Sequence, residues 1–131
     1  MNYYLRNDEK GESMDIIVRG KEYMTDYDML KGLTGTTEGW IWRGPHRPQC
    51  NDGDRVYFHK NQTVAGYCFY KGFDYRKSKN VEGKEQAGMA IVLKGPFSEF
   101  RNPVPCDLPG RWLWCYVTRI PGLSVSLARA R

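Results

Sequence analysis

The chain has no long apolar run and few histidines or cysteines, and each shortage excludes a class of protein. No stretch approaches the roughly 20 apolar residues that a transmembrane helix needs. The two histidines and four cysteines include no Cys-x-x-Cys pair, so we expect no structural metal site. Phosphate loops, dinucleotide fingerprints and the HExxH and GxSxG motifs are also missing. We therefore expect no cofactor, and the large enzyme classes that those motifs mark are unsupported.

The start of the sequence lacks the apolar core of a secretory signal and carries polar and charged residues instead. We therefore expect a cytoplasmic protein that does not bind membranes and that keeps its cysteines reduced. Cys68 and Cys115 lie in strand-like runs, where a free thiol packs as a small core residue. The other two cysteines are Cys50 and Cys106.

Aromatic residues, glycine and proline are what the chain has in abundance. Of 131 residues, 14% are aromatic, and there are 14 glycines and seven prolines. Aromatic rings pack well on a pleated sheet, while glycine and proline supply turns between short strands. The length suffices for one domain with its own core. We predict a single β-rich α+β domain over residues 1–131, a half-open barrel of five or six strands with one or two short helices, and flexible tails at 1–13 and 122–131.

The clearest local pattern is a hairpin over residues 51–70. A turn at Asp52 and Gly53 leads into an aromatic strand, a short polar turn follows, and a second strand returns. Gly66 and Gly72 in that second strand predict a sharp bend or the close approach of another backbone. The remaining expected elements are strands at 14–19, 40–43, 87–93 and 111–118, a short helix at 21–31, an exposed loop at 74–86 and an ordered proline-containing connection at 95–110.

Two stretches of the chain resemble the PUA-like superfamily of pseudobarrels, which includes the PUA, EVE, YTH and ASCH domains. The first runs from Gly53 to His59 (Gly-Asp-Arg-Val-Tyr-Phe-His) and continues from Thr63 to Tyr67 (Thr-Val-Ala-Gly-Tyr). The second, residues 92–105, is similar to the strand and proline-containing loop after the central hairpin of EVE and YTH domains. Both stretches lie within residues 53–105. The resemblance implies a small half-open barrel that binds nucleic acid.

Two Trp-x-Trp pairs are candidates for a binding site, because alternation projects both rings of a pair from one face of a strand. An exposed ring can stack on an unpaired base, which contributes about 1–3 kcal/mol per base. Packing in the core is the alternative for any one ring, but four tryptophans exceed the needs of a small core. We predict that RNA or a modified or extruded base, in RNA or DNA, binds to Trp40, Trp42, Arg43, Trp112 and Trp114.

The net charge of +5 favours contacts with phosphate, although solubility alone would also explain it. Arginine pairs with phosphate in a bidentate manner while neighbouring rings stack on bases. The densest basic segment is Tyr-Arg-Lys-Ser-Lys at 75–79, for which a solvated loop is the alternative. The predicted contacts with the nucleic-acid backbone are Arg47, Arg55, Arg76, Lys77 and Lys79.

The resemblance to ASCH domains implies a second function, a small amidohydrolase or ribonuclease acting on a modified nucleoside or on RNA. ASCH domains commonly carry a Gly-Lys-Lys-Thr-like motif followed by an acidic residue and an arginine, and residues 31–43 hold a looser version of it. A threonine nucleophile needs a base, which a desolvated lysine or a glutamate supplies. The residues predicted for this role are Lys31, Thr37 and Glu38; an ordinary loop is the alternative.

A third possibility is an accessory protein, of a phage for example, whose aromatic face binds another protein. The sequence leaves open the identity of the ligand and the oligomeric state.

Overall fold

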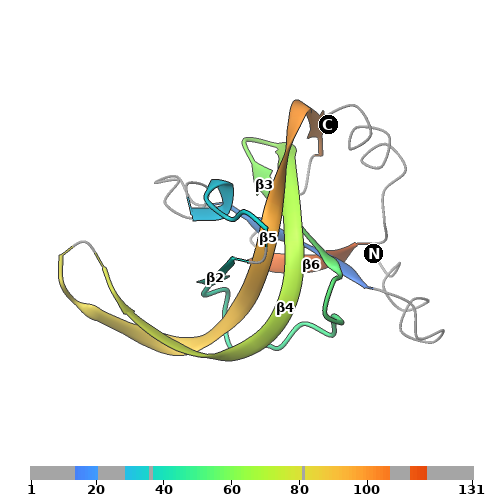
Figure 1. Cartoon of the computed structure of the whole chain (residues 1–131). Coiled ribbons are helices and arrows are strands. Elements are labelled where there is room, and N and C mark those ends of the chain that lie inside the picture. The colour runs from blue at the N-terminus through green and yellow to red at the C-terminus, as the bar shows by residue number, and fades with distance from the viewer. Residues whose placement is uncertain (1–13, 21–28, 36, 81, 107–112, 118–131) are drawn as a thin grey trace.

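The computed structural model describes residues 14–20, 29–35, 37–80, 82–106 and 113–117. Within them one mixed sheet contains six strands: β1 (Asp15–Arg19), β2 (Glu38–Ile41), β3 (Arg55–Lys60), β4 (Thr63–Lys79), β5 (Glu85–Pro105) and β6 (Trp114–Val117). Their order is β2-β5-β4-β3-β1-β6, and only β1 and β3 are parallel (Figure 1). The predicted β-rich fold is confirmed. The sheet is not closed by backbone pairing between β2 and β6 in the part of the chain that the structure describes.

The predicted hairpin of residues 51–70 is present as β3 and the first part of β4. Asn61 and Gln62 connect the strands with φ angles of 51° and 59°. Positive φ at both central residues is the mark of a type I′ turn, whose twist matches that of paired strands. A Cβ at Gly66 would overlap the carbonyl oxygen of Ser98 and the ring of Phe97, so the close backbone approach predicted there is confirmed.

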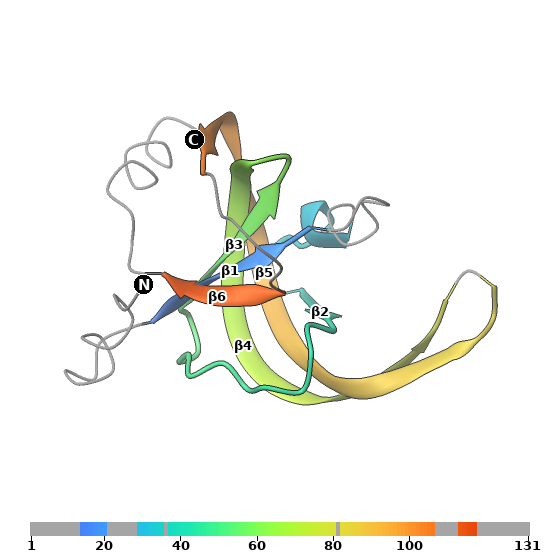
Figure 2. The ribbon, with the colours of Figure 1, turned by 180° about the vertical axis from the view of Figure 1, so that it is seen from behind.

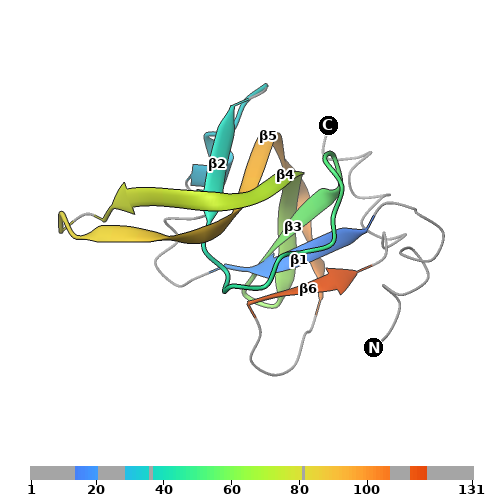
Figure 3. The ribbon, with the colours of Figure 1, turned by 90° about the horizontal axis from the view of Figure 1, so that it is seen from below.

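Two apolar clusters lie on opposite faces of the sheet. The first contains Ile16 and Val18, and the second contains Ile17, as the alternation along a strand requires. Cys68 is buried in the first cluster, as expected, and Cys115 borders the second. Apolar side chains therefore cover both faces of this part of the sheet. Figure 3 shows β1 and β6 crossing below β3, with β2 on the other side of the coiled sheet.

The largest difference from expectation is the length of β4 and β5. Residues 74–86 were predicted to form an exposed loop, but residues 74–79 pair with 85–90 in a continuous ribbon. We call these two segments the arm. Figures 1 and 2 show it curving away from the rest of the sheet. The prediction was wrong because most of the arm is solvent-exposed, so its sequence carries no alternation of apolar and polar residues.

The predicted connection at 95–110 is also wrong over its first part, because β5 continues to Pro105. Pro96 and Pro103 coincide with register shifts between β4 and β5. A strand tolerates proline where a bulge has already interrupted the ladder.

The other predicted elements are shorter than expected or lie partly outside the described residues. The strand predicted at 40–43 is shifted to Glu38–Ile41, and that at 111–118 is seen as Trp114–Val117. Of the helix predicted at 21–31, residues 29–31 are helical and 21–28 lie outside the described ranges, as do the predicted tails. Within those ranges no helix has the length and apolarity needed to cross a membrane.

Candidate nucleic-acid interface

Trp40 and Trp42 pack against the base of the arm. Their ring centroids are 6.5 Å apart and the rings are nearly perpendicular. Trp40 and Ile41 are consecutive residues of β2 and project from opposite faces of the strand. Ile41 belongs to the first cluster, so Trp40 points away from that cluster. The guanidinium carbon of Arg76 is 5.8 Å from the Trp40 centroid, within cation–π range. Trp42 Nε1 donates to the carbonyl oxygen of Gly88 at 3.4 Å. The predicted pair therefore joins β2 to both strands of the arm.

One side of the arm presents an aromatic ring beside basic groups. Tyr75 is 55% exposed, and its cross-strand partner Met89 is 41% exposed. Lys77 and Lys79 follow on the same side of β4 and are exposed, spaced by about 6.6 Å along the strand. We call Tyr75, Lys77, Lys79 and Met89 the exposed arm face. It combines a surface on which a base can stack with cations for phosphate.

The opposite side of the arm is less cationic. Arg76 Nη1 lies 2.7 Å from Asp74 Oδ2, and this hydrogen bond, with one from the backbone N–H of Tyr75, lowers the pKa of Asp74. Because Asp74 stays ionised, it compensates part of the charge of Arg76. On the exposed arm face Lys77 lies opposite Ala87 and Lys79 lies opposite Glu85, so Lys77 is the cation of β4 in the arm with no directly opposed carboxylate.

Arg43, predicted to bind ligand, is instead buried at 3% exposure. Its Nε and Nη2 donate to the carbonyl oxygen of Arg19 at 3.2 and 3.0 Å, and Nη1 donates to that of Trp42 at 2.9 Å. Arg19 N in turn donates to the carbonyl oxygen of Leu113. The segment after β2 is thereby held beside β1 and the start of β6. A guanidinium committed to these carbonyls is unsuited to a rim that contacts phosphate.

Trp114 lies on the side of the sheet that faces the first cluster, in edge-to-face contact with Tyr116 at 4.9 Å. Trp40 points to the other face of the sheet, so these two predicted ligand residues do not share one face. Trp112 lies outside the described residues.

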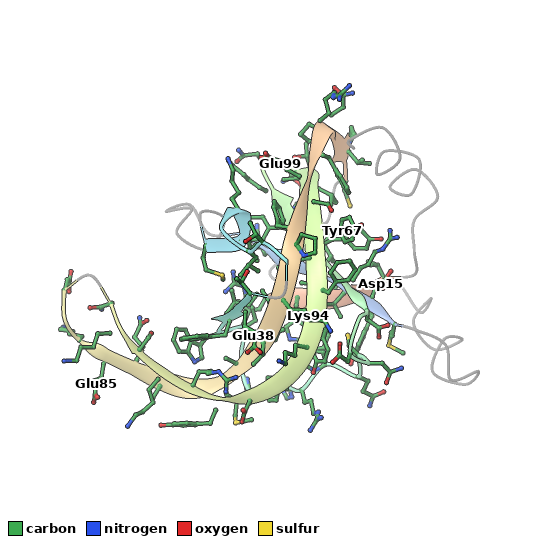
Figure 4. All side chains as sticks on the ribbon, viewed as in Figure 1. Asp15, Glu38, Tyr67, Glu85, Lys94 and Glu99 are labelled. Atoms are coloured by element: carbon green, nitrogen blue, oxygen red, sulfur yellow. The ribbon has the colours of Figure 1, made fainter. Side chains whose placement is uncertain are left out.

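The remaining predicted phosphate contacts lie away from the arm. Arg55 Cζ is 4.7 Å from the ring centroid of Tyr67, which is buried in the second cluster. Figure 4 shows Tyr67 far from Glu85, which belongs to the arm. Arg47 is exposed in the segment that connects β2 to β3. Of the predicted set, the arm therefore brings together Arg76, Lys77 and Lys79.

The predicted catalytic residues have partners outside their own set. Thr37 Oγ1 accepts a hydrogen bond from Thr34 N at 2.7 Å and donates to the carbonyl oxygen of Thr34 at 2.8 Å. Glu38 forms an ion pair with Lys71. Lys31 Nζ lies 3.8 Å from Glu99, which is well separated from Glu38 in Figure 4. These contacts close a turn and link surface charges, and they bring no base to Thr37.

Met89 belongs to the exposed arm face but was not predicted to be exposed, because it falls within residues 87–93, which were predicted to form a buried strand. Residues 82–86, just before that run, are mostly polar. They were the available signal that the first residues of the run are also exposed and that burial along β5 begins only at Ala90.

No protein-family model, curated protein or solved structure matches the chain. The four cysteines are free thiols. Among the described residues, no three His, Cys, Asp or Glu side chains are grouped to hold a metal ion.

Proposed function

We propose that the protein binds single-stranded nucleic acid, RNA foremost, along the exposed arm face. The observation that carries this proposal is the 55% exposure of Tyr75 beside Lys77 and Lys79 on a ribbon that extends from the rest of the sheet. Proteins that bind single strands combine aromatic rings that stack on bases with cations that follow the backbone.

Each part of the face has a separate role in this proposal. The ring of Tyr75 stacks on one base, extruded from its neighbours, and the thioether of Met89 extends the apolar surface on which that base lies. Lys77 and Lys79 neutralise phosphates and release counterions. Arg76, packed on Trp40, keeps the base of the arm attached to β2. Trp40 and Trp42 thus act by positioning the arm.

The test is fluorescence anisotropy with a labelled 12-nucleotide RNA at low salt. Tyr75→Ala should weaken binding by about 1–3 kcal/mol, the loss of one stacked base. Tyr75→Phe keeps the ring and should bind nearly as tightly as the natural protein. Failure of the natural protein to bind any single-stranded RNA or DNA would refute the proposal, and so would equal binding by the Tyr75→Ala variant.

A further inference from the structure

The arm is a two-stranded ribbon whose outer edges are both unpaired in the part of the chain that the structure describes. β2 pairs with β5 only over residues 91–94, and β3 pairs with β4 only over residues 63–69. Of residues 74–79 and 85–90, Ala90 alone is buried. A ribbon of two strands is marginally stable in water, and further strands or a packed face stabilise it. The arm would therefore gain stability from a strand added to one of its edges.

The two edges of the arm differ in how well they are protected from pairing. On β4, Asp74 Oδ1 accepts a hydrogen bond from the N–H of Tyr75, and Arg76 Nη1 donates to the carbonyl oxygen of Tyr75. Arginine and lysine also occupy half of residues 74–79, and charged side chains are a common protection of edge strands. On β5, residues 86–90 (Gln-Ala-Gly-Met-Ala) carry no charge. The edge of β5 is therefore the one to which a strand can be added.

Trp42 packs on this part of β5 from one face. A Cβ at Gly88 would lie 3.6 Å from Trp42 Cδ1, so the indole ring covers the face from which a side chain at this position would project. Side chains project from the faces of a strand, whereas backbone N–H and C=O groups point along its edges. The Gly88 carbonyl oxygen accepts from Trp42 Nε1 at 3.4 Å and has a second lone pair for another donor. The edge is therefore open from Glu85 to Ala90, next to the pairing with β2.

We propose that the β5 edge of the arm, residues 85–90, pairs antiparallel with the same edge of a second copy of this chain. The twofold axis of such a pair is perpendicular to the sheet and passes through Ala87 or Gly88. Neither position opposes like charges, because residues 86–90 are uncharged. Pairing through the two β4 edges would instead oppose segments that each carry an excess of cations. The open stretch of β5 lies between a turn and β2, and this pairing brings the turn of each copy toward β2 of the other.

The pairing uses the edge of the ribbon, whereas the proposed function uses its exposed arm face, so the two proposals are independent. A twofold axis perpendicular to the sheet leaves equivalent faces of the two arms on the same side. The dimer would therefore present both exposed arm faces on one side of a four-stranded ribbon.

The test is sedimentation velocity over a range of protein concentrations. The natural protein should sediment as a dimer that dissociates on dilution. Ala87 is exposed, so Ala87→Glu and Ala87→Lys should both fold. Each places like charges directly opposite or one diagonal apart across the pair and should raise the dissociation constant about fivefold or more. An equimolar mixture of the two variants should recover dimers, because opposite charges then meet, and a misfolded chain would show no such recovery.

Ser78→Glu is the matched control. Ser78 lies on β4 opposite Gln86, so the variant adds a charge to the arm one strand away from the β5 edge and should dimerise as the natural protein does. A natural protein that is monomeric at every concentration would overturn the proposal and leave the edge to a strand of another protein. A dimer whose dissociation constant neither Ala87 variant changes would overturn it as well, because the contact would then lie elsewhere.

Discussion

Tyr67 and Tyr75 lie on the same strand and have opposite environments. Tyr67 is 1% exposed and contacts the rings of Tyr57, Phe69 and Phe100. Tyr75, eight residues further along β4, is 55% exposed on the arm. Neighbouring strands and both apolar clusters cover the first half of β4, whereas in the arm only β5 pairs with it. The same side chain therefore stabilises the fold in one half of the strand and is free to contact a partner in the other.

The largest expected effect is a difference in the free energy of unfolding between alanine variants of these two tyrosines. Tyr67→Ala should lower the free energy of unfolding by about 3–5 kcal/mol, as truncation of large buried rings does. Tyr75→Ala should change it by less than about 0.5 kcal/mol, because an exposed ring loses little on truncation. Urea unfolding followed by fluorescence measures both. A comparable loss in the two variants would mean that the arm is part of the core.

Two glycines of β4 give a second test of how closely this strand is packed. Gly66→Ala should cost about 1–3 kcal/mol, because the new Cβ overlaps Ser98 and Phe97 and the strands must separate. Gly72→Ala is the matched control, since a Cβ there meets nothing within 4 Å. Urea unfolding should therefore show a loss in the first variant alone. If Gly66→Ala were as stable as the natural protein, the packing of β5 over β4 at this point would be incorrect.

The charge of the exposed arm face gives a third test. Replacing Lys77 and Lys79 together by alanine should reduce the slope of log affinity against log salt by about 1.4, the value for two phosphate contacts with a single strand. The control is a double variant that combines Lys31→Ala with Arg101→Ala and so removes two positive charges outside the arm. Anisotropy titrations at several salt concentrations should show a normal slope for the control. Equal slopes in the two double variants would assign binding to the net charge of the whole protein.

The smallest expected effect is a pH dependence of stability that arises from Cys115, in the covered part of the sheet. Burial, with a smaller contribution from Cys106, raises the pKa of Cys115 from 9.0 to about 11. The folded chain holds this proton more tightly than the unfolded chain, so its contribution to stability should decline as pH rises from 9.0 to about 11. Thermal unfolding across that range should show a smaller decline in Cys115→Ala. An identical decline in both proteins would contradict the assignment to Cys115.

The features of the fold that depend on neighbouring residues were predictable from the sequence. The hairpin was predictable because its turn and the alternation of its strands involve neighbouring residues, and the crowding at Gly66 was predictable from glycine within a strand. The arm was not predictable by the same means, since a ribbon exposed over most of its surface resembles a loop in composition. The candidate interface was predicted in part. Lys77 and Lys79 were named, but their place beside Tyr75 on a paired strand was not.

The sequence by itself determined where most strands run and that the protein is rich in β structure, because backbone pairing and turn chemistry depend on local residue types. The tertiary structure alone decided which side chains remain exposed. Arg43 is buried against the carbonyl of Arg19, while Lys77 stays in solvent. Burial depends on which distant strands and connecting segments cover a residue, and local composition carries little of that information.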